Sequence, residues 1–156
     1  MYNPEFMKEA IRLANLCFED GQGGPFGAVV VKDGQIIGRG HNMVTAHNDP
    51  TAHAEVMAIR DACQKLGTFQ LTGCELYASS EPCPMCFGAI YWARPDRIYF
   101  GASCEDAADA GFDDSFIYEE LGKDVEQYTI PTEQHDRDIA KVTFERWKDF
   151  EGKVEY

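Results

Sequence analysis

Basic residues are scarce in this chain: its 156 residues include 14 Lys and Arg against 27 Asp and Glu, which gives a formal net charge of −13. A protein that binds phosphates gains affinity from Lys and Arg, whereas a field of this sign repels a polyanion. No stretch of the chain concentrates its basic residues. The composition therefore argues against a nucleic-acid partner, and we expect a small, uncharged substrate.

The chain also lacks a basic start followed by a long apolar run, so we expect no secretory signal, no membrane-spanning segment and no membrane partner, and a cytoplasmic location. Internal repeats, low-complexity tracts and interdomain linkers are absent as well. A chain of this length can bury a core of its own. We therefore predict a single domain over residues 1–156.

The six cysteines do not indicate disulfides, because a chain of this size without a leader is expected to keep its thiols reduced. Four of them have no informative spacing and are interpreted as small buried hydrophobic residues: Cys17, Cys63, Cys74 and Cys104. The remaining two, Cys83 and Cys86, form a C-x-x-C pair that suits a metal site.

Hydrophobic periodicity and turn signals predict alternating strands and helices. Strands are predicted at residues 26–31, 36–40, 76–79 and 97–101, and helices at residues 4–20, 53–66, 85–93, 115–121 and 139–150. The helix at 85–93 is apolar on every side, as a fully buried helix would be. Residues 43–50 are predicted to be a loop, and the acidic last third is expected to be rich in loops. This order of elements indicates a layered α/β sandwich.

The most informative residues are His53 and Glu55, followed by Cys83 and Cys86. One histidine and two cysteines provide three zinc ligands and leave the fourth tetrahedral corner free, as in a catalytic site. The pattern matches the signature of zinc nucleobase deaminases, H-x-E followed by P-C-x-x-C. A C-x-x-C alone could be a redox pair or half of a zinc ribbon. A redox pair leaves the His-x-Glu unexplained, and the second C-x-x-C that a ribbon needs is absent.

Glu55 provides an internal test of this interpretation, because on a helix it stands at the head of an apolar stripe. The stripe consists of Ile59, Ala62, Cys63 and Leu66. The helix dipole explains an acidic residue in the first turn but not its inward direction, and an inward carboxylate is costly without a partner. Zinc lowers the pKa of its bound water to roughly 7. We predict that Glu55 moves protons from this water to the ring nitrogen and the departing amine of the substrate.

Around these residues the chain resembles the cytidine and nucleobase deaminase superfamily. The resemblance rests on residues 24–30, Asn42, residues 53–55 and residues 82–86. Bacterial tRNA adenosine deaminases share these motifs, so the motifs alone do not identify the substrate. Longer stretches resemble the short zinc-dependent bacterial guanine deaminases, namely residues 48–55, 88–95 and 110–118 and the final Glu155-Tyr156. Only residues 122–146 or so have no distinctive match.

The resemblance implies a three-layer α/β/α sandwich of the cytidine deaminase type, with a five-stranded mixed sheet and one zinc ion held by His53, Cys83 and Cys86. It also implies a homodimer that exchanges a C-terminal segment of about residues 140–156, so that Tyr156 closes the site of the neighbouring chain. The alternative is an amphipathic terminal helix that packs on its own core. The sequence alone does not separate these two arrangements.

In the family that the chain resembles, the base stacks on an aromatic residue at the Phe26 position. It is hydrogen-bonded from the Asn42 and Asp114 positions and by main chain near Ala54. Each side chain also has a local interpretation: Phe26 as a core aromatic, Asn42 as a turn residue and Asp114 as a helix cap. An anionic Asp114 would suit guanine, whose N1–H and 2-amino group are both donors.

These features predict zinc-dependent hydrolytic deamination of guanine to xanthine and ammonia, with attack at C2. Alternatives are another small aminohydrolase, acting on cytosine or an aminotriazine such as ammeline, and a tRNA adenosine deaminase. The charge of −13 disfavours the tRNA substrate. A zinc-stabilised binding module without turnover is a further alternative. The presence of Glu55 argues against it, because a structural site has no use for a carboxylate that is not a ligand.

Overall fold

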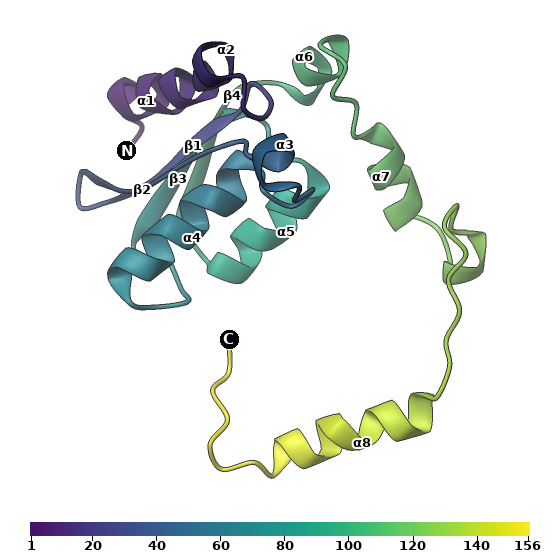
Figure 1. Ribbon diagram of the computed structural model, residues 1–156. Helices are drawn as coiled ribbons and strands as arrows, with labels where there is room; N and C mark the ends of the chain where they lie inside the picture. Colours follow the sequence, from purple (N-terminus) through teal and green to yellow (C-terminus); the bar gives the residue numbers. More distant parts are fainter. The chain divides into compact units, whose positions relative to one another are not determined.

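The computed structural model describes all of residues 1–156. It contains two compact units, residues 1–114 and residues 115–156. Figure 1 shows the secondary structure of each unit. The first unit contains the whole β-sheet and all the predicted site residues except Tyr156, and the second contains only helices and connecting segments.

The first unit is built on a four-stranded mixed sheet. Its strands are β1 (Gly27–Lys32), β2 (Gln35–His41), β3 (Cys74–Ser80) and β4 (Arg97–Ala102), in the spatial order β2-β1-β3-β4. Strand β1 is antiparallel to β2 and β3, whereas β3 and β4 are parallel. Asp33 and Gly34, with φ of 49° and 73°, form the turn between β1 and β2. The four strands predicted from periodicity are confirmed.

The expectation of a fifth strand is wrong, because the chain enters a helix directly after β4. The hydroxyl of Ser103 accepts a hydrogen bond from the backbone N–H of Asp106, and the Asp106 carboxylate accepts one from the backbone N–H of Ser103 at 2.8 Å. This capping box starts α6 (Cys104–Asp109). Backbone groups that enter a helical turn cannot pair with a strand. Strand β4 is therefore an edge strand of the sheet, and it is largely exposed.

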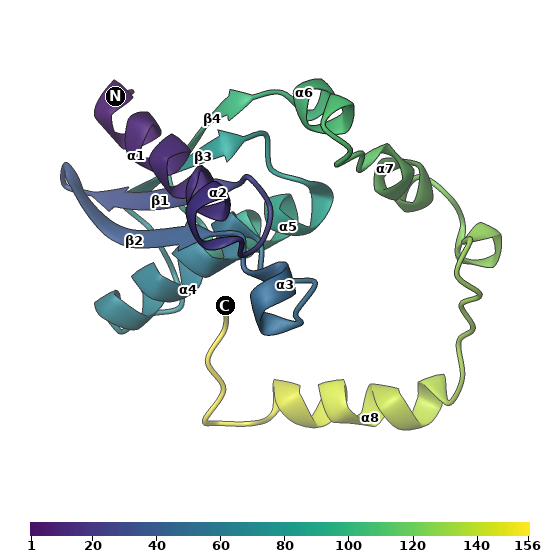
Figure 2. The ribbon, with the colours of Figure 1, turned by 45° about the horizontal axis from the view of Figure 1, so that its top comes forward.

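Helices cover both faces of the sheet (Figure 2). One face is covered by α1 (Pro4–Ala14), which is followed by the short α2 (Leu16–Asp20). The other is covered by α4 (Ala54–Leu66) and α5 (Pro84–Ala93). The continuous helix predicted up to residue 20 is divided at Asn15, which ends α1. The predicted loop at 43–50 contains a further short helix, α3 (Val44–His47).

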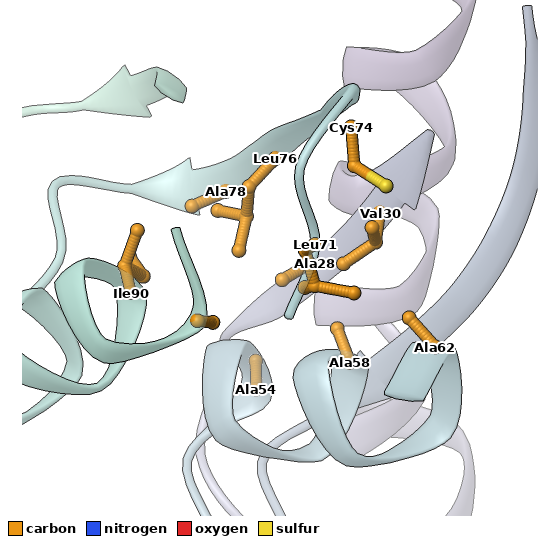
Figure 3. Packing of buried hydrophobic residues seen from close by; sticks show 11 residues of the cluster. Ala28, Val30, Ala54, Ala58, Ala62, Leu71, Cys74, Leu76, Ala78 and Ile90 are labelled. Carbon is orange, nitrogen blue, oxygen red and sulfur yellow. The ribbon is translucent and has the colours of Figure 1, made fainter. Parts of the chain in front are cut away.

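The larger hydrophobic core lies between the sheet and the α4–α5 layer. Leu71, Leu76 and Ile90 are its largest buried side chains, and alanines form the face that α4 presents to it (Figure 3). A second cluster, which includes Val29 and Tyr77, lies under α1. Of the four cysteines expected to be buried, only Cys74 is buried; the others are half-buried.

The prediction that α5 is buried on every side is wrong. Its buried residues Cys86, Ile90 and Ala93 recur at helical spacing and form one face of the helix, and only this face packs against the rest of the first unit. The opposite face exposes 48% of Phe87, 65% of Tyr91 and 64% of Trp92. Aromatic side chains gathered on one outer helix face are characteristic of interaction surfaces.

The second unit contains α7 (Ser115–Leu121), a short 3-10 helix (Val125–Gln127) and α8 (Arg137–Lys148). The helix predicted at 115–121 is confirmed, and α8 lies two residues before the helix predicted at 139–150. The large apolar side chains of the second unit are exposed within this chain, among them Ile130, Ile139, Val142, Phe144, Trp147, Phe150, Val154 and Tyr156. None of the helices in the chain combines the length and the hydrophobicity that crossing a bilayer requires.

Candidate active site

The N-termini of two helices bring the three predicted zinc ligands together. His53 is the N-cap of α4, Cys83 is the N-cap of α5, and Cys86 lies in the first turn of α5. The Sγ atoms of Cys83 and Cys86 lie 3.5 and 3.4 Å from Nδ1 of His53. All three ligand atoms lie within 4.8 Å of one another. The pattern of one nitrogen and two sulfurs is therefore realised in three dimensions.

The separations between these atoms fit a tetrahedral zinc site. With Zn–S bonds of about 2.3 Å and Zn–N bonds of about 2.0 Å, tetrahedral angles place a ligand sulfur and a ligand nitrogen roughly 3.5 Å apart. The structure shows this separation for both sulfurs. Three protein ligands leave the fourth position of such a site open to water or substrate.

The environment of Cys83 favours a thiolate, the form in which cysteine binds a metal. The pKa of Cys83 is lowered to about 4, first by its hydrogen bond with the Cys86 thiol and further by His53, although burial opposes this. The pKa of Cys86 is raised, because its proton is held by Cys83 and its side chain is buried. The N-terminal end of the α5 dipole stabilises negative charge at the same place.

Glu55 is the one buried charged residue of the chain, with 7% of its surface exposed. It lies in the first turn of α4, two residues after His53, and its Oε2 is 3.4 Å from Sγ of Cys86. Burial is the main cause of the raised pKa of its carboxyl group. The structure thus places a carboxylate beside the ligand cluster that is not itself needed to complete the three-ligand set.

Two glycines of β2 allow α4 to approach the sheet closely. A Cβ atom at Gly40 would lie 2.2 Å from the carbonyl oxygen of Ala54 and 2.4 Å from the backbone nitrogen of Ala58. A Cβ atom at Gly38 would lie 2.5 Å from the carbonyl oxygen of Ala58. Gly40 therefore sets how closely the turn that carries Glu55 packs on β2. Our sequence interpretation missed this role, although paired glycines within a strand are a known signal of close backbone approach.

Gly40→Ala is expected to destabilise the first unit by about 1–3 kcal/mol, the usual size of an overpacking defect. The added methyl group meets backbone atoms of α4, which cannot rotate away as a side chain could. Chemical denaturation of purified protein would measure this. Gly122→Ala is the control, because its Cβ meets only ordinary contacts at 3.6 and 3.9 Å. Equal stability of Gly40→Ala and wild type would show that α4 is not held against β2 in this way.

The two predicted base-binding residues Phe26 and Asn42 are neighbours in the structure. The backbone N–H of Asn42 donates a hydrogen bond of 3.0 Å to the carbonyl oxygen of Phe26. Asn42 is 7% exposed, and its Oδ1 accepts hydrogen bonds from Gly24 and Val44. Phe26 is half-buried, and its ring meets that of Phe112 edge-on at 4.9 Å between centroids.

Asp114 ends the first unit and is half-buried. Its pKa is raised first by burial and then by the negative charge of Cys83, which places it in the electrostatic field of the ligand cluster. Glu81 connects this region to the cysteine loop, because its carboxylate accepts a hydrogen bond of 3.0 Å from the backbone N–H of Cys104 at the start of α6. No local pattern of residues signals this connection, which spans 23 residues.

The other two predicted contacts lie at a helix start and at the chain end. Ala54 is the first residue of α4, and the side chain of the N-cap residue His53 makes no hydrogen bond to the first-turn N–H groups. Tyr156 belongs to the second unit, where 69% of its surface is exposed. The structure thus gathers the ligands, Glu55, Ala54 and Asp114 around the start of the two helices, with Phe26 and Asn42 forming a pair of their own.

Residues 2–102 match the family described as the cytidine and deoxycytidylate deaminase zinc-binding region. The chain belongs to this family. The match includes His53, Cys83, Cys86 and Glu55, so the ligand cluster lies within the family's zinc-binding region. The protein is accordingly a zinc-dependent deaminase.

Among the relatives of this deaminase, guanine deaminase of Bacillus subtilis is 55% identical over 156 residues. The aligned residues cover 100% of this chain and 100% of that protein. The crystal structure of that guanine deaminase superposes with a TM-score of 0.96 over 100% of this chain and 99% of the other. The tRNA-specific adenosine deaminase of Aquifex aeolicus is 48% identical over 97 residues, which cover 62% of this chain and 64% of that protein. The deaminase thus resembles the first relative over its full length and the second over the shared zinc region.

Proposed function

We propose that this deaminase converts guanine and water to xanthine and ammonia. The observation that supports this most strongly is the extent of the similarity to a guanine deaminase. It runs through all 156 residues at 55% identity, including residues 103–156, which lie outside the family's zinc-binding region. The net charge of −13 fits a neutral base better than a tRNA.

In this proposal His53, Cys83 and Cys86 hold the metal and Glu55 carries the protons. A zinc ion held there would lower the pKa of the attacking water and so make it nucleophilic at neutral pH. Glu55 takes a proton from the attacking water and delivers it to ring nitrogen N3 as the C2–O bond forms. It then takes the second proton from the oxygen now bonded to C2 and passes it to the 2-amino group, which leaves as ammonia as the C2–N bond breaks and the C2=O bond forms. The position of Glu55, buried and 3.4 Å from a ligand sulfur, supports this role.

The remaining contacts are assigned to recognition of the base. Phe26 stacks on the purine ring, and Asn42 donates to an acceptor of the ring, because its own oxygen is already occupied by two backbone N–H groups. Asp114 accepts from the N1–H and 2-amino edge, and a first-turn N–H near Ala54 donates to the base. An aspartate at this edge favours guanine over adenine, which has no ring N–H there.

Ammonia release by zinc-loaded protein tests the proposal directly. Guanine, adenine, cytosine, ammeline, guanosine and an adenosine-bearing tRNA anticodon stem are compared at equal concentrations. Fast release from guanine is expected, with the other five much slower. Release of ammonia from the tRNA stem but not from guanine would overturn the substrate assignment. Release from cytosine or ammeline alone would show that the protein is another small aminohydrolase.

We further propose that the active protein is a cytoplasmic homodimer, serving purine breakdown, in which the second unit of one chain closes the site of its partner. The second unit exposes its large apolar side chains in the single chain, and α5 exposes three aromatic residues. Large exposed apolar patches on a protein mark surfaces that bind another molecule. A second copy of the chain offers complementary apolar surfaces for both.

Deleting residues 147–156 is expected to lower kcat/KM for guanine about tenfold or more, the equivalent of ~1.4 kcal/mol or more of lost interaction, and to leave zinc content unchanged. The deletion removes Trp147, Phe150 and Tyr156 but none of the metal ligands. Steady-state kinetics and elemental analysis measure the two properties. Lys153→Ala in the full-length chain is the control and is expected to behave as wild type. Unchanged kinetics after deletion would rule out a role of the tail in closing the site.

Co-expression of two defective chains distinguishes an exchanged tail from one that folds back on its own chain. A Glu55→Gln chain keeps its tail, and the truncated chain keeps its Glu55. If tails are exchanged, the mixed dimer combines an intact tail with an intact catalytic site, and activity exceeds that of either chain alone. If each tail closes its own site, mixing restores nothing.

A further inference from the structure

The loop that contains Gly23 and Gly24 packs closely against Asn42, and the side chain of Thr45 in α3 stabilises this arrangement. Gly23 has a φ of +69°, and a Cβ atom at this position would lie 1.8 Å from the carbonyl oxygen of Asn42. Only glycine can make this approach. The backbone N–H of Gly23 donates a hydrogen bond of 3.0 Å to Oγ1 of Thr45, which lies in α3.

The same loop fixes the orientation of the Asn42 amide group. Oδ1 of Asn42 accepts two hydrogen bonds, one from the backbone N–H of Gly24 and one from that of Val44, each 3.1 Å long. A carbonyl oxygen has two lone pairs, so both are used. If the amide were flipped, its NH₂ group would face two N–H donors and both bonds would be lost. The amide nitrogen Nδ2 is therefore held in the position of an outward donor.

Thr45 connects these contacts to helix α3. Gly24 is the residue after Gly23, so an anchored Gly23 keeps the Gly24 N–H directed at Asn42. The loop also supports Phe26: a Cβ atom at Gly24 would lie 3.3 Å from its ring, and the Gly24 carbonyl oxygen accepts from the Phe26 N–H at 2.9 Å. One hydroxyl group thus stabilises both side chains assigned to the base.

We propose that Thr45 is a positioning residue for substrate recognition: through Gly23 and Gly24 it fixes Asn42 as a hydrogen-bond donor to an acceptor atom of the purine. The role in recognition rests on the proposed function, because it requires that Asn42 binds guanine. The arrangement of the loop does not depend on the substrate. Thr45 itself is exposed and lies outside the ligand cluster, so its replacement leaves the metal site untouched.

Thr45→Val tests the proposal, because valine has nearly the same shape and lacks the hydroxyl acceptor. The KM for guanine is expected to rise roughly fivefold, the size of one net hydrogen bond, with kcat changed less than twofold. Thr45→Ser keeps the hydroxyl and is expected to restore the wild-type KM. In an Asn42→Ala background, Thr45→Val is expected to have no further effect, because the residue through which it acts is gone.

Two outcomes would overturn the proposal: a wild-type KM in Thr45→Val, or an equal rise in KM with and without Asn42. A measurement without substrate separates this from the proposed function. Hydrogen exchange of the Gly23 and Gly24 amides, followed by NMR, is expected to be faster in Thr45→Val than in Thr45→Ser. Unchanged exchange would refute the role of Thr45 in holding the loop, whatever the substrate. Faster exchange in a protein that does not deaminate guanine would instead refute the substrate assignment.

Discussion

Glu55→Gln is expected to lower the turnover of guanine at least ~100-fold, the lower end of what a general acid–base group contributes. Glutamine has nearly the shape of glutamate, but its amide group cannot take up and return a proton at neutral pH. Zinc should remain bound, because Glu55 is not among the three ligands. Unfolding should occur at the same or a higher temperature, because the substitution removes a carboxylate that is only 7% exposed.

Three measurements on the same preparation separate catalysis from folding: ammonia release, zinc per chain by elemental analysis, and thermal unfolding. Glu19→Gln in α2 provides the matched control, because it makes the same chemical change at an exposed position and should keep full activity. Near-normal turnover by zinc-replete Glu55→Gln protein would eliminate Glu55 as the proton carrier. Loss of zinc together with activity would assign Glu55 to the metal site instead.

Much of the metal site could be predicted from the sequence, because its determinants are local. Cys83 and Cys86 are three residues apart at a helix start, and His53 and Glu55 share the first turn of another. Residues so close in the chain lie within one turn of each other whenever the helices form. Bringing the two helix starts together required the fold, and the order of strands and helices predicted an α/β arrangement that permits it.

Contacts between segments distant in the chain could not be predicted in this way. The hydrogen bond between Gly23 and Thr45 joins residues 22 apart, and that between Glu81 and Cys104 joins residues 23 apart. Neither pair has a periodicity or spacing that distinguishes it from ordinary loop residues. The close approach of Gly40 to α4 also joins distant segments: the strand glycine signals that a backbone approaches closely, but not which element does so.

Two of the incorrect predictions about the first unit concern its outer surfaces. A fifth strand was expected beyond β4, where Ser103 and Asp106 instead start a helix by a local capping interaction. Helix α5 was expected to be surrounded by the core, but its outer face carries exposed aromatic residues. Hydrophobicity shows that a face requires burial, but not whether the same chain or another copy provides it.

Cys83→Ser is expected to abolish stoichiometric zinc binding and to lower turnover more than ~100-fold. Replacing a residue that only orients a metal ligand already costs up to about 100-fold, and Cys83 is a ligand itself. A serine hydroxyl is not ionised at neutral pH, whereas the pKa of Cys83 is lowered to about 4. The two remaining ligands, His53 and Cys86, cannot complete a three-ligand site. The fold should persist, because the core under α4 and α5 is formed by other side chains. Elemental analysis, circular dichroism and ammonia release measure these three properties.

Cys17→Ser is the control for this variant. Cys17 is a half-buried free thiol in α2 and is not one of the three ligands, so its replacement should leave one zinc ion per chain and normal turnover. Partial recovery of Cys83→Ser activity in excess zinc would support a weakened metal site rather than a misfolded one. Full activity of a Cys83→Ser protein that contains no zinc would contradict the assignment, since the remaining residues would then have to generate the nucleophile without the metal.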